Sequence, residues 1–312
     1  MKDMYDVVVI GGGAAGLSGA LMLGRSRRSV LVVDAGEPRN APAEGVHGLL
    51  ARDGMPPAEL LERGRDEIRR YGAEVEHGVV GAVSGGEGDF VVALADGRTV
   101  GARRLLVATG LVDDLPAVEG LRERWGRDVV HCPYCHGWEI RDHAIGVLAS
   151  GPMTAHQALG FRQLSDDVTV FLNDQPELPA EQAEQLAARG IPLVAGAVAA
   201  VEVEDDRIVG VRLADGTVVP RQVVVVASRM TAHVDFLAPI GIKPAEHPTG
   251  MGTHVACDSD GRTEVPGVWI AGNATDLSAQ VGPAATAGAL AGAQINADLI
   301  DEEARAAVAA TR

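Results

Sequence analysis

Several short stretches of the chain are apolar almost without interruption, and glycine-rich turns bound them. Runs of this length, rich in β-branched residues, predict buried strands. The predicted strands lie within Tyr5–Ile10 (YDVVVI), SVLVVD ending at Asp34, Leu105–Gly110 (LLVATG), Ala144–Leu148, Val168–Phe171 and Val268–Ala271. Helix-like stretches follow the first and the last of them, as LSGALMLGR and as the glycine- and alanine-rich residues Pro283–Ile300. Strands followed by helices in this way predict an α/β fold built from βαβ units.

The turn after the first predicted strand reads GGGAAG, in which Gly11, Gly13 and Gly16 have the G-x-G-x-x-G spacing. In a dinucleotide-binding turn the first glycine permits the tight bend, the second lets the backbone approach a pyrophosphate, and the third lets helix and strand pack closely. The N–H groups at the start of the following helix would bind the phosphates. Asp34, at the end of the second strand, is placed to accept hydrogen bonds from a ribose. A lone glycine motif is also common in structural turns, but the complete strand–turn–helix–strand–acid pattern favours a dinucleotide site.

Composition narrows the function classes. At roughly 150 residues per domain, the length of 312 residues predicts two domains, and the hydrophobic content of 46% is enough for sizeable cores. The 43 acidic residues outnumber the 27 basic ones, and the formal net charge of −16 disfavours nucleic acid and anionic membrane surfaces as partners. No apolar run reaches the ~18 residues of a membrane span, and the first residues lack the pattern of a signal peptide. A cytoplasmic protein is therefore expected.

The stretch HCPYCHGWE, residues 131–139, holds Cys132 and Cys135, two of the three cysteines of the chain, in a C-x-x-C spacing. Three cysteines make no disulfide framework, and in a reducing compartment such a pair is typical of a catalytic or metal-binding site. One thiol of such a pair often has a depressed pKa, and its thiolate is the reactive species. The two sulfurs can close a small ring that thiol–disulfide exchange opens again.

Two other chemistries use similar spacings. A structural zinc site needs about four ligands, but Cys257 stands alone, and His131 and His136 adjoin the pair too closely to complete a tetrahedron easily. The string Cys132-Pro-Tyr-Cys135-His136 also matches the c-type haem attachment pattern, although covalent haem requires export and no export signal is recognised. No metal is expected, and a redox-active pair acting on a flavin fits the surrounding nucleotide-binding pattern best.

Three segments carry a resemblance to a known family: the glycine fingerprint, the ATG turn and the late segment PGVWIAGNATD. They resemble the FAD-binding domain of flavoprotein disulfide reductases that have two dinucleotide-binding domains. The most similar pattern is that of the low-molecular-weight thioredoxin reductase type. The resemblance covers nearly the whole chain. It implies an α/β fold with two Rossmann-like domains of the three-layer ββα type: a discontinuous FAD-binding domain, residues 1–115 and 247–312, and an inserted NAD(P)H-type domain, residues 116–246. It also implies a homodimer with FAD as cofactor.

The resemblance assigns a set of residues to FAD binding, which comprises Gly11, Gly13, Ala14, Ala15, Gly16, Asp34, Ala108, Thr109, Gly110, Gly272, Asn273, Gln280 and Val281. One of them departs from the family, which usually has an aspartate where this chain has Asn273. An amide can still hydrogen-bond a ribityl or phosphate oxygen, but it carries no charge. Asp276 lies nearby in sequence and could substitute for the missing carboxylate.

The same resemblance assigns roles around the cysteine pair. Cys135 would face the flavin and Cys132 the thiol of the substrate. His136 stands where thioredoxin reductases have an aspartate that moves protons, and a histidine, which titrates near neutrality, can act as general base. His131 in its protonated form could lower the pKa of a thiol. Either histidine could instead only hydrogen-bond the backbone, and Glu139 could equally be a fold residue.

The inserted domain should carry a second glycine fingerprint, for NADPH. In the sequence ASGPMT the three fingerprint positions become Ala149, Gly151 and Thr154. A Cβ at the first position hinders the tight turn. NADPH-dependent members place two arginines after the next strand to hold the 2′-phosphate, where this chain has Asn173 and Asp174. Poor NADPH binding is therefore expected, although an acid at a strand end can hold the ribose of NADH.

The active-site string and the eroded nicotinamide site together resemble the FAD-dependent dithiol oxidases of the gliotoxin and holomycin pathways. That resemblance implies a small-molecule dithiol substrate, oxidised to an intramolecular disulfide, and oxygen as acceptor, reduced to hydrogen peroxide. The alternatives are a thioredoxin reductase-like enzyme that uses NADH, ferredoxin or another donor, a dithiol oxidase that reduces NADP⁺, and a non-catalytic flavin sensor or dithiol-sequestering protein. Residues 43–54, AEGVHGLLARDG with His47, are candidates for lining the substrate pocket.

Overall fold

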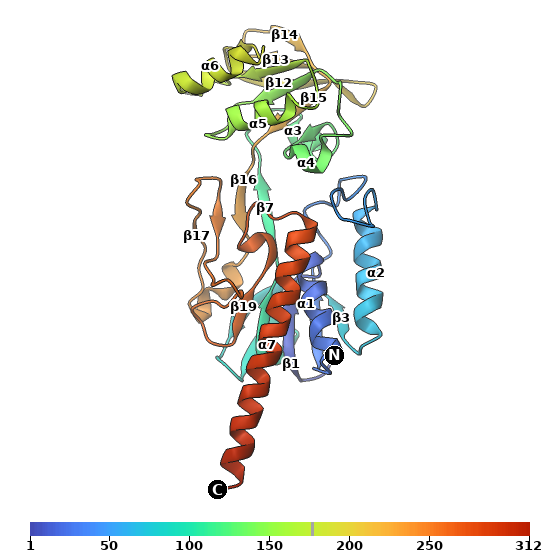
Figure 1. Ribbon diagram of the computed structural model, residues 1–312, viewed down its shortest axis with the longest axis vertical. Helices are drawn as coiled ribbons and strands as arrows, with labels where there is room; N and C mark the ends of the chain where they lie inside the picture. Colours follow the sequence, from blue (N-terminus) through green and yellow to red (C-terminus); the bar gives the residue numbers. More distant parts are fainter. Residues whose placement is uncertain (176–177) are drawn as a thin grey trace. The chain divides into compact units, whose positions relative to one another are not determined.

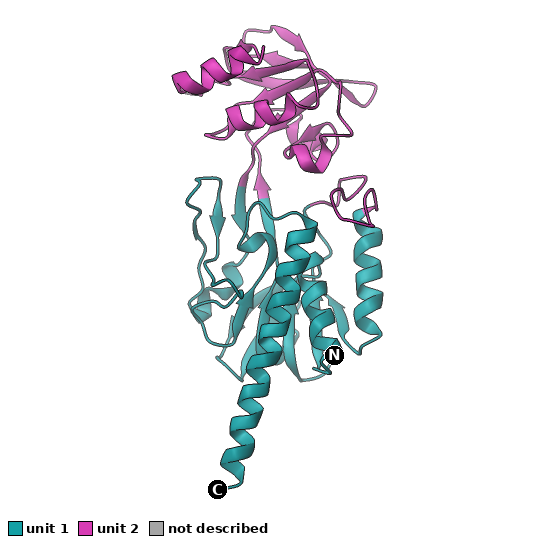
Figure 2. Cartoon of the chain, viewed as in Figure 1, with its two compact units in different colours: residues 1–39, 57–112, 230–312 teal, residues 40–56, 113–229 magenta. Residues whose placement is uncertain are grey.

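The computed structural model of the chain describes residues 1–175 and 178–312 (Figure 1). It divides into two compact units, each of which is discontinuous in sequence (Figure 2). Unit 1 comprises residues 1–39, 57–112 and 230–312, and unit 2 comprises residues 40–56 and 113–229. Strands β7 (Leu111–Asp114) and β16 (Arg229–Ala232), which pair with each other, carry the chain across the boundary between the units.

Unit 1 is a layered α/β structure around one sheet with the strand order β3-β2-β1-β6-β5-β4, to which β19 adds beside β6. Strands β1, β2, β3, β6 and β19 pair in parallel, while β4 and β5 pair antiparallel beside β6. The strands are β1 (Met4–Ile10), β2 (Val30–Asp34), β3 (Glu74–His77), β4 (Val80–Ser84), β5 (Phe90–Leu94), β6 (Thr99–Val107), β17 (Ala245–Glu246), β18 (Thr253–His254) and β19 (Val268–Ile270). The helices are α1 (Ala14–Arg25), α2 (Pro57–Arg69), η1 (Asp235–Ile240), η2 (Gly272–Ala274) and α7 (Val281–Ala310).

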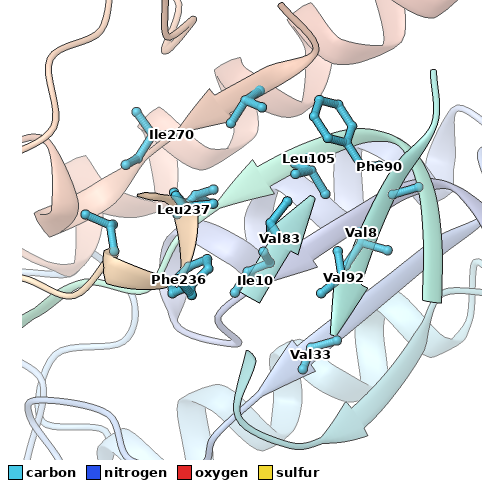
Figure 3. Close-up of a cluster of buried hydrophobic side chains, with 14 of the residues drawn as sticks. Val8, Ile10, Val33, Val83, Phe90, Val92, Leu105, Phe236, Leu237 and Ile270 are labelled. Atoms are coloured by element: carbon cyan, nitrogen blue, oxygen red, sulfur yellow. The ribbon is translucent and has the colours of Figure 1, made fainter. Parts of the chain in front are cut away.

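Both faces of the central strand β1 are buried, which explains its unbroken apolar sequence. Side chains alternate between the faces of a strand, so Val8 and Ile10 enter one core while Val7 and Val9 enter the other. Figure 3 shows the first of these cores, which β4, β5 and η1 complete. The second core lies under helices α1 and α7.

Helices α1 and α7 cross at glycines. A Cβ added to Gly288 of α7 would lie 1.9 Å from the carbonyl oxygen of Ala15 in α1, and one added to Gly292 would lie 2.7 Å from that of Gly19. The two helices can therefore approach backbone to backbone only because these positions have no side chain. This contact brings the start of α1, with the glycine fingerprint, close to α7 near the end of the chain.

Unit 2 has a parallel sheet with the order β11-β10-β9-β15-β8 and an antiparallel sheet with the order β12-β13-β14. Its strands are β8 (Val129–Val130), β9 (Ile145–Leu148), β10 (Val168–Phe171), β11 (Leu193–Val194), β12 (Val198–Glu204), β13 (Arg207–Leu213), β14 (Val218–Pro220) and β15 (Val223–Val226). Its helices are α3 (Leu121–Arg124), α4 (Pro133–His136), α5 (Thr154–Phe161) and α6 (Ala180–Ala188). Two Rossmann-like units in one chain confirm the expected α/β fold class.

The compact units differ from the expected domain segments in two places. Residues 230–246 fall in unit 1 rather than in an inserted segment 116–246, because Phe236 and Leu237 of η1 are buried in the core of Figure 3. Residues 40–56 fall in unit 2 rather than in a segment 1–115. In that segment Pro42 lies so close to Gly126 that a Cβ on the glycine would approach the proline ring to 2.7 Å.

Candidate active site

The glycine turn of unit 1 is shaped as a dinucleotide-binding turn. Gly11 has a φ of +106°, and a Cβ there would lie 2.4 Å from the carbonyl oxygen of Ala108. A Cβ on Gly16 would lie 1.9 Å from the carbonyl oxygen of Gly11. Each of these positions therefore requires glycine, the first for its backbone conformation and both for their close contacts. Asp34 braces the turn, because its Oδ1 accepts a hydrogen bond from the N–H of Gly12 at 3.1 Å.

Four parallel strands bring the remaining predicted FAD residues to the same edge of the sheet. Strands β1, β2, β6 and β19 all end there. A Cβ on Gly272, after β19, would lie 3.0 Å from the Cβ of Ala15 and 3.9 Å from that of Ala284 in α7. The ATG turn after β6 adjoins Gly11. Segments more than 250 residues apart in sequence are thus neighbours at this edge.

Two local observations fit a bound dinucleotide. A Cβ on Gly13 would meet no other atom within 4 Å, so the start of α1 is open on the side where a pyrophosphate would lie. Gly13 is the N-cap of α1 and no side chain caps the helix, which leaves its N–H groups available for phosphate. The Oγ1 of Thr109 is buried, and among the described residues it has no hydrogen-bond partner. A polar group of a cofactor at this turn would satisfy it.

Asn273 has a clear structural reason to be an amide. Its Nδ2 donates to the backbone carbonyls of Asp276 at 3.0 Å and Ala279 at 2.8 Å, which holds the turn that leads into α7. An aspartate could accept hydrogen bonds but could not donate these. Asp276 is exposed, and its Oδ1 accepts from Ser278. Gln280 is the N-cap of α7, and Val281 is its first residue.

The cysteine pair lies in unit 2, at the short helix α4 (Figure 1). Cys132 is the N-cap with an extended backbone, Pro133 occupies the first turn and Cys135 lies three residues after Cys132. Residues three apart share a helix face, and the Sγ atoms of the two cysteines are 2.6 Å apart. A disulfide between them requires little further approach.

Two contacts that the sequence did not indicate hold this helix. The Nε2 of Gln157 in α5 donates a hydrogen bond of 3.1 Å to the backbone carbonyl of His131, directly before Cys132. Gly137, the C-cap of α4, has no room for a side chain, because a Cβ would lie 2.1 Å from the carbonyl oxygen of Pro133. The glutamine is buried in the middle of α5, and its spacing in the sequence is that of an ordinary core-facing residue.

The two flanking histidines are in different environments. The Nδ1 of His131 lies 3.2 Å from the carbonyl oxygen of Val226. Because a carbonyl only accepts, Nδ1 carries the proton and Nε2 is the acceptor in the neutral form of this ring. The Nε2 of His136 is buried and has no hydrogen-bond partner among the described residues. Burial lowers the pKa of His136; Glu139 opposes that effect, and His47 adds to it. The His136 ring therefore stays neutral at a pH at which the ring of an exposed histidine is already protonated.

The second glycine fingerprint, in unit 2, does not have the geometry of the first. Ala149 is buried and its φ is not positive, whereas Gly11 at the matching position bends with a φ of +106°. Thr154 is also buried, and its Oγ1 donates to the carbonyl of Gly151 at 2.8 Å, so a side chain fills the place where the first fingerprint has none.

At the strand end that follows, the described residues 173–175 offer no cation for a 2′-phosphate. The Oδ1 of Asn173 accepts a hydrogen bond from the N–H of Val198 at 2.9 Å, and Asp174 is exposed. These residues do not fit NADPH.

A glycine turn of this kind and a paired dithiol in one chain define a flavin-dependent disulfide oxidoreductase. The chain belongs to the pyridine nucleotide-disulphide oxidoreductases, whose family model matches residues 5–293. Its relatives are thioredoxin reductase-like proteins, FAD is the cofactor of this family, and the expected family and cofactor are thereby confirmed.

Three relatives illustrate the similarity. Thioredoxin reductase sirT of Leptosphaeria maculans is 31% identical over 314 residues, with 94% of each chain covered. A probable thioredoxin reductase of Arthroderma benhamiae is 33% identical over 185 residues, an alignment that spans 55% of this chain but only 44% of that protein. The crystal structure of HlmI is 44% identical, has a TM-score of 0.93, and the superposition covers 99% of this chain and 97% of HlmI.

None of the helices within residues 1–175 and 178–312 has the length and apolar character needed to cross a membrane. In the same part of the chain, no group of three or more His, Cys, Asp or Glu side chains is arranged to hold a metal ion.

Proposed function

We propose that the protein is an FAD-dependent dithiol oxidase, which forms an intramolecular disulfide in a small-molecule dithiol of the gliotoxin or holomycin kind and uses oxygen as the acceptor. The observation that carries the proposal is the contrast between the two glycine fingerprints. The first retains every conformational feature of a dinucleotide turn, whereas Ala149 and Thr154 fill the second with side chains. An enzyme whose nicotinamide site does not fit NADPH can instead receive its electrons from a thiol substrate, which supports the oxidase direction.

The cysteine pair performs the sulfur chemistry. A substrate thiolate attacks the Sγ of Cys132 in the oxidised pair, forming a mixed disulfide and releasing Cys135 as a thiolate. The second thiol of the substrate then displaces Cys132, so the product leaves as a cyclic disulfide and the enzyme retains both electrons as a dithiol. When bound, FAD supplies the two-electron acceptor that returns the pair to its disulfide, and oxygen takes up these electrons as hydrogen peroxide.

The histidines are the candidate acceptors for the two protons that the substrate thiols release. A neutral imidazole is required to accept a thiol proton, and the lowered pKa of His136 keeps that form available toward acidic pH. His131 is the second candidate base, and its Nδ1 is engaged with the carbonyl of Val226. Both histidines adjoin the cysteines in sequence.

The proposal predicts peroxide without any nucleotide. When dithiothreitol or reduced gliotoxin is mixed with the yellow protein in air, one oxygen should be consumed and one hydrogen peroxide released for each disulfide formed. The monothiol 2-mercaptoethanol should react much more slowly, because the second displacement is then no longer intramolecular. An oxygen electrode and a peroxidase-coupled assay measure both quantities. Dithiol oxidation that proceeds without oxygen consumption would contradict the proposal.

The nicotinamide turn predicts a second result. Under anaerobic conditions an excess of NADPH or NADH should leave the flavin absorbance near 450 nm unchanged over the time in which a dithiol bleaches it. The physical reason is the filled turn at Ala149 and Thr154, together with the carboxylate of Asp174, which repels a 2′-phosphate. Rapid bleaching by NADH would favour the reductase alternative instead. Binding of a dithiol without peroxide release in air would favour a sensor or a sequestering protein.

A further inference from the structure

Residues 40–56 form an ordered loop, although they contain almost no regular structure. Val46 and Met55 form an isolated antiparallel bridge, with the N–H of Val46 donating to the carbonyl of Met55 at 2.8 Å. The side chain of Val46 is buried. The N–H of Gly48 donates to Oδ1 of Asp53 at 2.9 Å, which closes the tip of the loop. The loop therefore presents its side chains in defined positions.

His47 lies between two carboxylates. Its Nδ1 is 3.6 Å from Oδ1 of Asp53 in the same loop, and its Nε2 is 3.4 Å from Oε1 of Glu139. Glu139 follows the redox helix α4 by three residues. Only the protonated ring has an N–H on both nitrogens, so the imidazolium form alone can bind both carboxylates. The contact joins the loop to the turn that follows the helix of the cysteine pair.

Glu139 also acts on His136. The charged groups that influence His136 are Glu139, which favours its protonated form, and His47, which disfavours it. Asp53 contacts this cluster through His47. The Nε2 of His136 has no hydrogen-bond partner among the described residues. Glu139 therefore acts on both imidazoles, through the 3.4 Å contact with His47 and through its charge on His136.

We propose that His47 is a positioning residue of the redox site. Held between Asp53 and Glu139, it fixes the 40–56 loop to the turn after α4 and shields His136 from the negative charge of Glu139. Loss of this contact frees the loop and exposes His136 to the full charge of Glu139. This inference rests on the proposed thiol chemistry of the pair, but both measurements that test it are made without turnover.

The first measurement follows the loop. Arg52, near the tip, is exposed and offers a trypsin site, and cleavage after it requires the loop to open locally. Both His47→Gln and Glu139→Gln should increase the rate of cleavage after Arg52, by about two- to fivefold as expected for a partly exposed ion pair. Mass spectrometry of the first fragments identifies the site. Comparing variants at one pH removes the pH dependence of trypsin itself.

The second measurement follows His136 directly, through the pH titration of its Cε1–H signal in histidine-labelled protein. His47→Gln should raise the midpoint of His136, because His47 disfavours its protonated form, whereas Glu139→Gln removes an anion and should lower it. His136→Gln assigns the signal. A general loosening of the site would move both midpoints in the same direction, so the opposite signs separate an electrostatic role from a structural one.

His143→Gln is the matched control. His143 lies in the same unit and is partly buried like His47, but its Nδ1 faces the carbonyl of Arg141 and it is not among the groups that act on His136. This variant should change neither the cleavage rate nor the titration. Unchanged cleavage in the His47 and Glu139 variants, or midpoint shifts of the same sign, would overturn the proposal. Failure of the oxidase itself would appear separately, as missing peroxide in the oxygen assay.

Discussion

Replacement of Cys132 or Cys135 by serine should lower the turnover of a dithiol by a factor on the order of 10³ or more, since removing a member of a covalent catalytic unit has effects of this size. A serine hydroxyl cannot form the disulfide that accepts the electron pair. FAD should remain bound in both variants, because its predicted residues lie in unit 1 and the pair lies in unit 2. Oxygen consumption with a dithiol and the flavin spectrum of the purified variants measure the two properties.

Cys257→Ser provides the matched cysteine control. This residue belongs to unit 1, and its Sγ lies 3.0 Å from the Oγ1 of Thr275, a contact that a serine hydroxyl can also make. Turnover should therefore stay close to that of the unmodified protein. Normal turnover by the Cys135→Ser variant would show that the sulfur chemistry does not use the pair. Loss of FAD from either active-site variant would mean that the substitution disturbs more than the reaction.

The two single variants should also differ from each other. In the proposed scheme Cys132 meets the substrate and Cys135 passes the electrons on, so a lone thiol at position 132 is the one that a disulfide reagent reaches. Cys135→Ser should form a stable mixed disulfide with an aromatic disulfide reagent faster than Cys132→Ser does. The release of the coloured thiol gives both rates. The reverse order would exchange the roles of the two cysteines.

The parts of the fold and the site that depend on local sequence could be predicted from it. The unbroken apolar run of β1 and the glycine spacing after it define a strand and a turn within a few residues, and Gly11 and Gly16 have the conformations and contacts expected of them. The adjacency of Cys132 and Cys135 is likewise local, because a three-residue spacing in one helical turn fixes it.

Contacts between distant segments were not predictable in the same way. Gln157 looks like any other residue of an amphipathic helix, and only the packing of α5 beside α4 shows that its amide holds the carbonyl of His131. The residues 230–246 were expected in the inserted segment, but the burial of Phe236 places them with unit 1. Nothing in the sequence distinguishes His47 as a partner of Glu139, since 92 residues separate them.

A single methyl group at position 13 should weaken FAD binding without disturbing the fold. The backbone of Gly13 has a φ of −77° and a ψ of −174°, which alanine adopts without strain, and the added Cβ would meet no protein atom within 4 Å. It would instead occupy the open space before the start of α1, where the pyrophosphate is expected. Overpacking of this kind costs about 1–3 kcal/mol, so FAD affinity should fall roughly ten- to a hundredfold. Flavin fluorescence on titrating the apoprotein measures it.

Two further alanine variants separate an effect on FAD binding from an effect on folding, and the first fingerprint from the second. Gly16→Ala brings a Cβ to 1.9 Å from the carbonyl oxygen of Gly11, so it should lower the melting temperature of the apoprotein as well as FAD affinity, whereas Gly13→Ala should lower only the affinity. Gly151 holds the matching position in unit 2, where a Cβ also meets nothing within 4 Å. If that turn binds no dinucleotide, Gly151→Ala should leave FAD content and dithiol turnover unchanged. Because the two alanine substitutions place the same group in the same kind of open space, a loss confined to position 13 assigns the cofactor to the first fingerprint. Equal FAD affinity before and after Gly13→Ala would refute that assignment.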